Sequence, residues 1–337
     1  MLHPSDDKNG GHQGTLRPPR RRGVLGYLGP AVALVLIAYA AIVIYRMATH
    51  IDPREIGVAM ETMAPWRFAV ALALTVISVV SLAAYDVCAI LVIRTRRPVD
   101  LGYAALCGGI SNVFANGLGF PILTGGTARY RLYSMIGLDF SAVGRIMALT
   151  WVTMWSGLVF VLALALTFVD GDREPVVFGP LADRFAGLAL FALLAATVVW
   201  IGRKRRAIRI AGWTVRLPTT PVLIGMILAG GVDMLASGMT LYILLPPDTV
   251  PSLSIFVIAY IVAILAGNAA NTPGGIGVFE ATMVTGLDLP ERPDVAAALI
   301  LFRIIYFLLP LMIALAVFGL VEWRYRRRRR LAGAEER

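Results

Sequence analysis

The chain has 337 residues, of which 58% are hydrophobic and only 15% are charged, and its formal net charge is +10. An ordinary soluble domain carries about 25% charged residues, so the composition excludes a soluble globular protein. Several apolar runs exceed the ~20 residues that a bilayer-spanning helix needs, which predicts an all-α polytopic membrane protein. The short alternating strands typical of an outer-membrane barrel do not occur in the sequence.

The types and positions of the polar residues narrow the function classes. Lys and Arg occur in short runs beside apolar segments, which is a topology signal, so nucleic acid is not an expected partner. Cys88 and Cys107 lie far apart in apolar stretches, which argues against a disulfide framework or a cysteine-based metal site. His3, His12 and His50 lie outside the apolar runs. We therefore expect no metal, no cofactor and no histidine-based hydrolase chemistry in the membrane.

The N-terminal part combines a polar segment with a first apolar run. Residues 1–22 are rich in Gly, Pro and Arg and are predicted to be a disordered cytoplasmic segment. The first span is predicted at residues 24–45. A cleaved signal peptide is the alternative, because residues 38–40 resemble a cleavage site, but the apolar run continues past them and favours an uncleaved signal anchor. Further full spans are predicted at residues 68–93, 142–169, 185–201, 221–245 and 296–321.

Two other apolar stretches, residues 101–135 and 252–288, are interrupted by glycine, asparagine and proline. Basic runs at 20–22, 94–97, 203–209 and 326–330, opposed by acidic loops, predict that both termini are cytoplasmic. The resulting parity requires each interrupted stretch to begin and end on the same side. Pairs of short spans satisfy this requirement too. We favour re-entrant hairpins, because the second arm of each has roughly a dozen residues, too few to cross.

The two halves of the chain, residues 24–169 and 185–321, show the same order of elements, and a basic cytoplasmic tail follows at 322–337. The halves begin on opposite sides, which predicts an inverted-topology repeat. Transporters use such repeats to build a site at the bilayer midplane from broken helices. The corresponding residues are Asp86 and Asp233, Gly125-Gly126 and Gly274-Gly275, and, loosely, Arg145 and Arg303.

The first hairpin is predicted to turn at Gly125-Gly126, since glycine permits a sharp reversal and close backbone approach. Thr124 or Thr127 can cap the half-helix that follows, whose free N–H groups favour an anion. Arg129 and Arg131 offer guanidinium groups that suit a phosphate, although residues two apart face different sides of a helix. The alternative role of these arginines is to extend to cytoplasmic lipid headgroups.

The second hairpin is predicted to turn within residues 268–280. Asn271 can cap its second half-helix, and Pro273 suits the first helical turn. Glu280 then lies inside an otherwise apolar segment, where a carboxylate is a functional candidate by default. The alternative role of Glu280 is a structural ion pair with Arg303.

Asp86 and Asp233 are the other acids embedded in predicted spans, and each is either functional or a packing group. Asn112 and Asn116 either satisfy the backbone of the first hairpin or face a ligand. The candidate substrate-binding residues are therefore Arg129, Arg131, Tyr130, Gly125, Gly126, Glu280, Arg303, Asp233, Asp86, Asn112, Asn116 and Asn271.

Several of these motifs resemble a known family. Residues 123–134 are similar to a signature of the lysylphosphatidylglycerol synthase transmembrane-region family. Residues 273–280 and 302–306 resemble its later motifs, and Tyr85-Asp86, Asn112 and Asn116 also fit. The resemblance covers roughly residues 24–325. It implies the flippase-domain fold, which occurs in bacterial multiple-peptide-resistance proteins that move aminoacylated phosphatidylglycerol between leaflets, and in stand-alone inner-membrane proteins.

The chain resembles the stand-alone kind, because it ends soon after the basic run 326–330 without an aminoacyl-transfer domain. We therefore expect no enzymatic activity. The leading hypothesis is a flippase of the bacterial inner membrane for an anionic or aminoacylated phospholipid such as lysylphosphatidylglycerol. A scaffold or small-solute transport protein is the alternative, followed by a lipid-modifying transferase. Compatible partners are membrane phospholipid, a separate soluble lipid-modifying synthase and a second copy of the chain.

Overall fold

The computed structural model describes residues 25–49, 57, 63–93, 95, 98–168, 179–203, 207–210, 213–249, 252–270, 273–290 and 292–335. The helices in chain order are α1 (Leu25–Thr49), α3 (Pro65–Val92), α4 (Leu101–Leu118), α5 (Pro121–Met135), α6 (Phe140–Thr167), α7 (Pro180–Arg203), α8 (Thr220–Leu244), α9 (Leu253–Ala270), the 3₁₀ helix η1 (Pro273–Gly275), α10 (Val278–Gly286), α11 (Pro293–Phe302), the π-helical segment η2 (Arg303–Leu308) and α12 (Leu309–Glu335). Strands β1 (Ala207–Ile210) and β2 (Trp213–Arg216) form a short antiparallel ladder between α7 and α8.

The predicted all-α polytopic class is confirmed. Within the described part of the chain, 6 helices are long and apolar enough to cross a membrane: α3, α6, α7, α8, α9 and the continuous helix from Pro293 to Leu331. All of these except α9 match predicted full spans. The first predicted span coincides with α1, a helix of 25 residues. The predicted disordered segment 1–22 lies outside the described residues.

Local sequence signals explain where several helices begin. Proline occupies the first turn of α3, α5, α8 and α11, where its missing N–H costs no intrahelical hydrogen bond. The Asp100 carboxylate accepts a hydrogen bond from the Tyr103 N–H (2.8 Å) and caps α4. The Asp139 carboxylate accepts from the Ala142 N–H (3.2 Å) and caps α6 in the same way. The hairpin arms are thus delimited by sequence-encoded caps.

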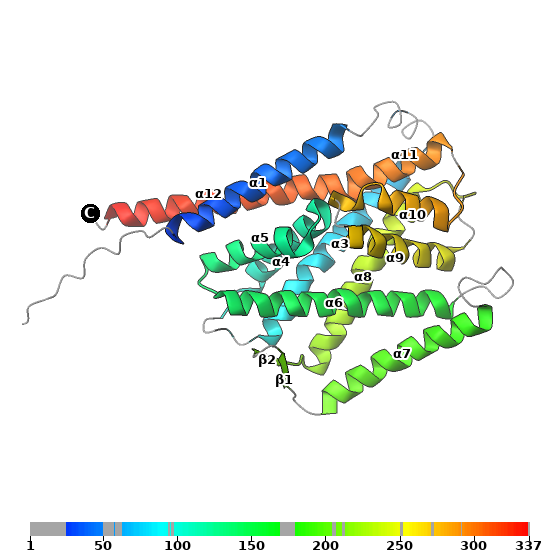
Figure 1. The fold of residues 1–337 in the computed structure, drawn as a ribbon, viewed down its shortest axis with the longest axis horizontal. Coiled ribbons are helices and arrows are strands. Elements are labelled where there is room, and N and C mark those ends of the chain that lie inside the picture. Colours follow the sequence, from blue (N-terminus) through cyan, green and yellow to red (C-terminus); the bar gives the residue numbers. More distant parts are fainter. Residues whose placement is uncertain are drawn as a thin grey trace, which may run out of the picture.

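Figure 1 shows the arrangement of the helices. Helices α3 and α8 pack together in the centre, α1 lies beside α12, and α6 crosses α8. Helix α7 lies at the edge of the bundle, where it contacts α6 and α8. The pair α4–α5 occupies one end of the bundle and the pair α9–α10 the opposite end, so the two hairpins enter from opposite sides (Figure 1). This is the arrangement expected of an inverted repeat.

Arm lengths support hairpins rather than pairs of short spans. Helix α5 has 15 residues and α10 has 9, so they extend roughly 22 Å and roughly 14 Å, against a hydrocarbon core of about 30 Å. Helix α9, with 18 residues, is long enough by composition to cross. The break at η1 nevertheless turns the chain back, and the short α10 cannot complete a second crossing.

The predicted turn of the first hairpin at Gly125-Gly126 is wrong. The chain reverses at Gly119 and Phe120, both with positive φ, and Pro121 begins α5. Gly125 lies inside α5, where a Cβ atom would be 2.6 Å from the Ser111 carbonyl oxygen of α4. Glycine is needed there for close packing of the two arms, and not for a turn.

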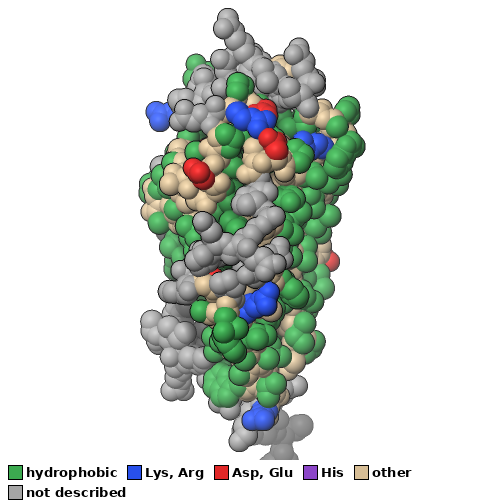
Figure 2. Space-filling model, turned by 90° about the vertical axis from the view of Figure 1, so that its right-hand side faces the viewer, with side chains coloured by type: hydrophobic (Ala, Val, Ile, Leu, Met, Phe, Trp, Pro, Cys, Tyr) green, Lys and Arg blue, Asp and Glu red, His purple; other side chains and the backbone are tan. Residues whose placement is uncertain are grey.

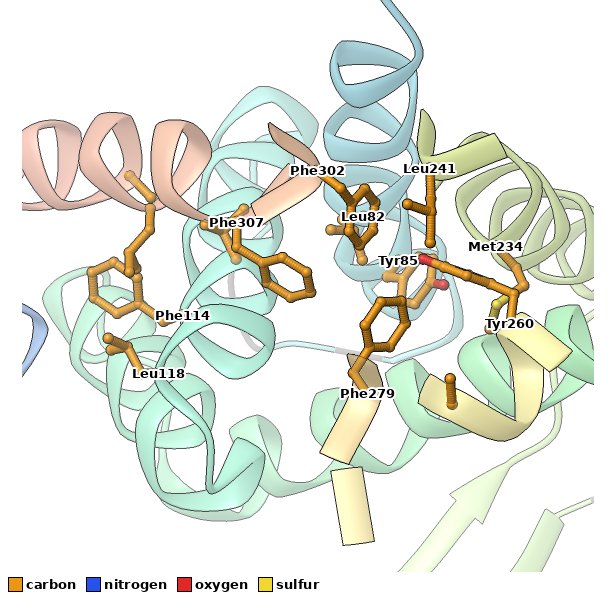
Figure 3. Packing of buried hydrophobic residues seen from close by; sticks show 14 of the residues in the cluster. Leu82, Tyr85, Phe114, Leu118, Met234, Leu241, Tyr260, Phe279, Phe302 and Phe307 are labelled. Atoms are coloured by element: carbon orange, nitrogen blue, oxygen red, sulfur yellow. The ribbon is translucent and has the colours of Figure 1, made fainter. Parts of the chain in front are cut away.

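The core is aromatic on one side of the bundle, and the outer surface is apolar. Figure 3 shows Tyr85, Tyr260 and Phe279 gathered in one part of the core, with Phe302 beside them. Large hydrophobic side chains are exposed along the outer helix faces, which suits a lipid environment. Figure 2 shows the end of the molecule at the right of Figure 1, where hydrophobic side chains dominate and charged ones form only small groups.

Candidate functional site

The first polar cluster joins the first hairpin to α3. The Arg129 guanidinium on α5 donates from Nε and Nη2 to the Asp86 carboxylate on α3, at 2.8–3.2 Å, and the side chains are only 5% and 0% exposed. The Tyr133 hydroxyl donates to the same carboxylate (3.0 Å). Asn112 accepts from Arg129 (3.0 Å) and donates to the Leu82 carbonyl (2.9 Å). Nε and Nη2 of Arg129 are therefore both engaged by the protein's own groups.

The second cluster joins the same hairpin to the C-terminal helix. The Arg131 guanidinium donates through Nε and Nη2 to the Glu322 carboxylate on α12, at 3.0 and 2.8 Å. Arg326, also on α12, donates to Glu322 (2.6 Å). The two arginines of the first hairpin thus turn to different partners, as their spacing predicts. The first hairpin is therefore held by one ion pair to α3 and by another to α12.

The third cluster lies at the turn of the second hairpin. Gly274, Gly275 and Gly277 have positive φ, a conformation that glycine adopts without steric cost, and they let the chain reverse into α10. The Glu280 carboxylate accepts from the Gly277 N–H (2.9 Å) and caps α10. Glu280 also pairs with the Arg303 guanidinium of η2. Arg303 donates to the Gly274 carbonyl as well (3.0 Å). The pair of Glu280 with Arg303 is the one predicted as the alternative role of Glu280.

This third cluster is more accessible than the first two. The side chains of Arg303 and Glu280 are 14% and 25% exposed, against 5% and 0% for Arg129 and Asp86. Asn268 at the end of α9 and Gly277 are exposed. The Arg303–Glu280 pair is therefore partly open to the surface of the molecule, whereas the Arg129–Asp86 pair is enclosed.

Asp233 differs from the other embedded acids, because its hydrogen-bond partners within the described residues are hydroxyl groups. Ser78 donates to its Oδ1 atom (2.5 Å) and Tyr85 to its Oδ2 atom (2.9 Å), both from α3. The Tyr306 hydroxyl of η2 lies 3.1 Å from Ser78 Oγ. Asp233 is buried, as are Ser78 and Tyr85. The carboxylate thus lies in a cage of hydroxyls at the α3–α8 contact.

The π-helical segment η2 connects the last two groups. Arg303, at its first position, reaches the second hairpin, and Tyr306 reaches the Asp233 cage. π-helical turns inside α-helices often occur at functional sites. Phe302 stacks between Phe279 of the second hairpin and Tyr306, with ring centroids at 5.6 and 5.2 Å. A movement of η2 would therefore be transmitted to both groups.

One small cavity lies next to this segment. It has a volume of about 10 Å³, the size at which a single water fits, and it lies between α3, α4, η2 and α12. Its lining residues are Val79, Leu82, Val113, Asn116, Gly117, Tyr306, Phe307 and Pro310. A cavity of this size is too small for a phospholipid headgroup.

The candidate residues are therefore only partly brought together. Tyr130 is exposed and contacts the Phe140 ring (5.8 Å) away from the clusters, and Gly125 and Gly126 are buried in α5. Asn116 is exposed at the small cavity, and Asn271 lies outside the described residues. Ser78 and Glu322, which complete the polar clusters, were not predicted. Tyr85 and Tyr133 lie in the motifs that resemble the family but were not among the candidate binding residues.

Those missed residues carry little sequence signal. Serine and tyrosine are ordinary residues in an apolar helix, and Glu322 lies in the basic tail, where it reads as a solvated charge. Placing Glu322 in the tail is corrected by the structure, in which α12 continues past it and its side chain is 5% exposed. The length of the last predicted helix is the one sequence signal that could have placed Glu322 within α12.

Comparisons with known proteins give two relatives. The chain is 28% identical over 296 residues to the uncharacterized protein slr0712 of Synechocystis sp., which covers 85% of this chain and 89% of that protein. It is 29% identical over 208 residues to the inner membrane protein YbhN of Escherichia coli, covering 58% of this chain and 62% of that protein. No protein-family model matches the chain.

Proposed function

We propose that this chain is an inner-membrane transporter that moves an anionic or aminoacylated phospholipid, such as lysylphosphatidylglycerol, between leaflets without changing it covalently. The similarity to a protein named as an inner membrane protein supports the location. The two hairpins that enter from opposite ends of the bundle support alternating access to a shared site (Figure 1).

One observation supports the proposal that the substrate is anionic. Glu280 binds at once to the Arg303 guanidinium and to the N-terminus of α10. These are the two features with which proteins bind phosphate: a planar guanidinium donor and free backbone N–H groups at a helix N-terminus. The carboxylate of Glu280 therefore occupies the position of an anionic ligand in this conformation. A lipid phosphate that replaces it would gain both partners.

The accessibility of this cluster supports entry at the second hairpin. Its ion pair is partly exposed and lies at a turn whose Gly277 is exposed, whereas the pair of Arg129 with Asp86 is enclosed. In this mechanism Arg303 holds the phosphate and Glu280, once released, faces the headgroup. A cationic aminoacyl group would then find a carboxylate partner in Glu280, which explains why an aminoacylated lipid is a suitable substrate.

The direct test is a transbilayer assay in proteoliposomes. Full-length protein is reconstituted with NBD-labelled phosphatidylglycerol, and dithionite reports the fraction of label that reaches the outer leaflet. Protein-dependent movement of this lipid, competed by lysylphosphatidylglycerol and not by phosphatidylcholine, is expected. An unchanged lipid distribution with and without protein would exclude lipid transport and favour a scaffold.

Paired variants identify the anion site. Arg303→Gln should reduce the rate of NBD-phosphatidylglycerol movement at least about tenfold, because a charge-assisted contact is lost. Arg292→Gln is the matched control, since Arg292 pairs with Asp248 and Asp294 on the surface, at 2.5 Å to each. Equal rates for both variants would remove Arg303 from the site.

A further inference from the structure

The hydroxyl cage around Asp233 has a feature that phosphate recognition does not use. A carboxylate only accepts hydrogen bonds, so Ser78 and Tyr85 both donate to it. The single hydroxyl proton of Ser78 is then committed to Asp233, which leaves Tyr306 as the donor in the 3.1 Å contact with Ser78. Tyr306, Ser78 and Asp233 therefore form a chain of hydrogen bonds with one direction.

This series of hydrogen bonds ends, at Tyr306, beside the small cavity. Tyr306 is one of the cavity-lining residues, and the cavity has room for one water. Asn116, also in the lining, is exposed, so the cavity opens to the surface of the molecule. A buried acid, an ordered series of hydroxyls and a water-sized opening are the components of a proton relay.

The electrostatic surroundings also suit an acid that changes its charge. The titratable groups that face Asp233 are Tyr85 from α3, Tyr260 from α9 and Tyr306 from η2, which are neutral near pH 7. Helix α8 itself contributes Ser237 nearby. The other embedded acids, Asp86 and Glu280, are neutralised by arginines. Among the three, Asp233 alone has partners that can accept or donate a proton without separating an ion pair.

We propose that Asp233 is a proton-binding site, reached from the cavity through Tyr306 and Ser78, and that its protonation drives the conformational cycle. A hydronium in the cavity gives a proton to the Tyr306 oxygen, Tyr306 passes its own proton to Ser78, and Ser78 passes its proton to Oδ1 of Asp233. The net change is one proton gained by the carboxylate and one lost by the hydronium. The hydrogen bonds between the cavity water and Tyr306, between Tyr306 and Ser78, and between Ser78 and Asp233 then each reverse their direction.

Coupling to the second hairpin follows from the position of Tyr306 on η2. Reversal makes Ser78 donate to Tyr306, which changes the contact that holds η2 against α3. The same segment carries Arg303, which binds Glu280 and the Gly274 carbonyl. Proton binding at Asp233 and the release of Arg303 from Glu280 thus both involve the π-helical segment η2. This coupling, though not the proton binding itself, rests on the proposed lipid transport.

Proton binding is tested without any lipid substrate. Infrared difference spectra of the purified full-length protein, titrated from about pH 4 to pH 9, report the carbonyl stretch of a protonated carboxyl group. A titrating band that is absent in Asp233→Asn is expected. A spectrum without such a band, or a band unchanged in Asp233→Asn, would overturn the proposal. A band that is displaced by Na⁺ at constant pH would overturn it too, in favour of a sodium site.

Coupling is tested with NBD-phosphatidylglycerol in proteoliposomes. Wild-type rates should change about tenfold or more across the titration, and Asp233→Asn rates should change less than about twofold. Ser78→Ala and Tyr306→Phe should slow the response, while Thr240→Val, which removes a buried α8 hydroxyl bonded to the Ala236 carbonyl, should not. Loss of the infrared band with pH-dependent transport intact would overturn coupling. The band without any lipid movement would leave the proton site standing and reject the lipid function.

Discussion

The two hairpins are held in place by different kinds of contact. The first, α4–α5, is fixed by two enclosed arginine–carboxylate pairs and by arms that touch at Gly125. The second, α9–α10, turns on three glycines with positive φ and packs through stacked aromatic rings, with one partly exposed pair. Enclosed ion pairs require exact geometry, whereas aromatic surfaces can slide. The first hairpin is built as a fixed element and the second as the one suited to move.

The variant expected to have the largest effect on this difference is Arg129→Gln. Removing the arginine leaves the Asp86 carboxylate enclosed and without its cation, which should lower the free energy of unfolding by about 3–5 kcal/mol. Thermal unfolding of purified protein in detergent, followed by size-exclusion chromatography, measures the loss. The double variant Asp86→Asn/Arg129→Gln should recover most of it. If the single variant is as stable as wild type, the first hairpin is not held by this pair.

The glycines of α5 offer a matched pair for the packing argument. A Cβ atom at Gly125 meets the Ser111 backbone oxygen, which cannot move alone, so Gly125→Ala should cost about 1–3 kcal/mol. At Gly126 the Cβ atom meets the terminal methyl of Met147, which can rotate away. Gly126→Ala should therefore leave the unfolding midpoint unchanged or raise it slightly. Equal losses in the two variants would contradict the packing described here.

In the second hairpin, Glu280→Gln should alter binding more than stability. The amide keeps an acceptor for the Gly277 N–H but removes the negative charge that competes with a phosphate for Arg303. Binding of NBD-phosphatidylglycerol should tighten about tenfold, which corresponds to about 1.4 kcal/mol. Fluorescence titration in detergent measures the change. Weaker binding in the variant would show that Glu280 is not the competitor of the lipid phosphate.

The smallest effect is expected at the surface. Hydrogen bonds from Arg292 hold the pKa of the Asp248 carboxyl below its ordinary value. A depressed pKa contributes stability above the ordinary value of about 3.9, and this contribution is lost as the pH falls through the folded-state pKa. Asp248→Asn should therefore leave the pH dependence of unfolding unchanged between about pH 5 and 8. Because both side chains are exposed, no resolvable shift in midpoint is expected.

Much of the fold was predictable, because the bilayer imposes strong rules. The lengths of the apolar runs and the positions of the basic runs predicted the membrane helices. The requirement that each interrupted stretch begin and end on one side predicted two hairpins that enter from opposite sides. The turn of the first hairpin was mispredicted, since Gly125-Gly126 resembles a turn in sequence as much as a helix contact. The true turn at Gly119 has a weaker pattern, and only the crossing of α4 over α5 distinguishes the two.

The site was predictable in its residues and not in their pairing. Arg129, Asp86, Glu280 and Arg303 stood out as charges in apolar segments, and the pair of Glu280 with Arg303 was foreseen as an alternative. The partner of Arg131 is Glu322, far away in sequence, and only the packing of α12 against the first hairpin brings them together. Long-range pairing of this kind has no local signature.

The ion pairs have an electrical consequence. Moving one elementary charge across a membrane potential of 100 mV changes the energy by about 2.3 kcal/mol. Arg129 and Arg131 of the first hairpin pair with Asp86 and Glu322, and Glu280 of the second hairpin pairs with Arg303, so a hairpin that shifts together with its partner moves almost no net charge through the field. The resting voltage of the cell neither drives nor opposes a motion that keeps these pairs together. In the proposed transport, the voltage dependence then reports the charge of the cargo, of Asp233 and of Arg303 and Glu280 once they separate.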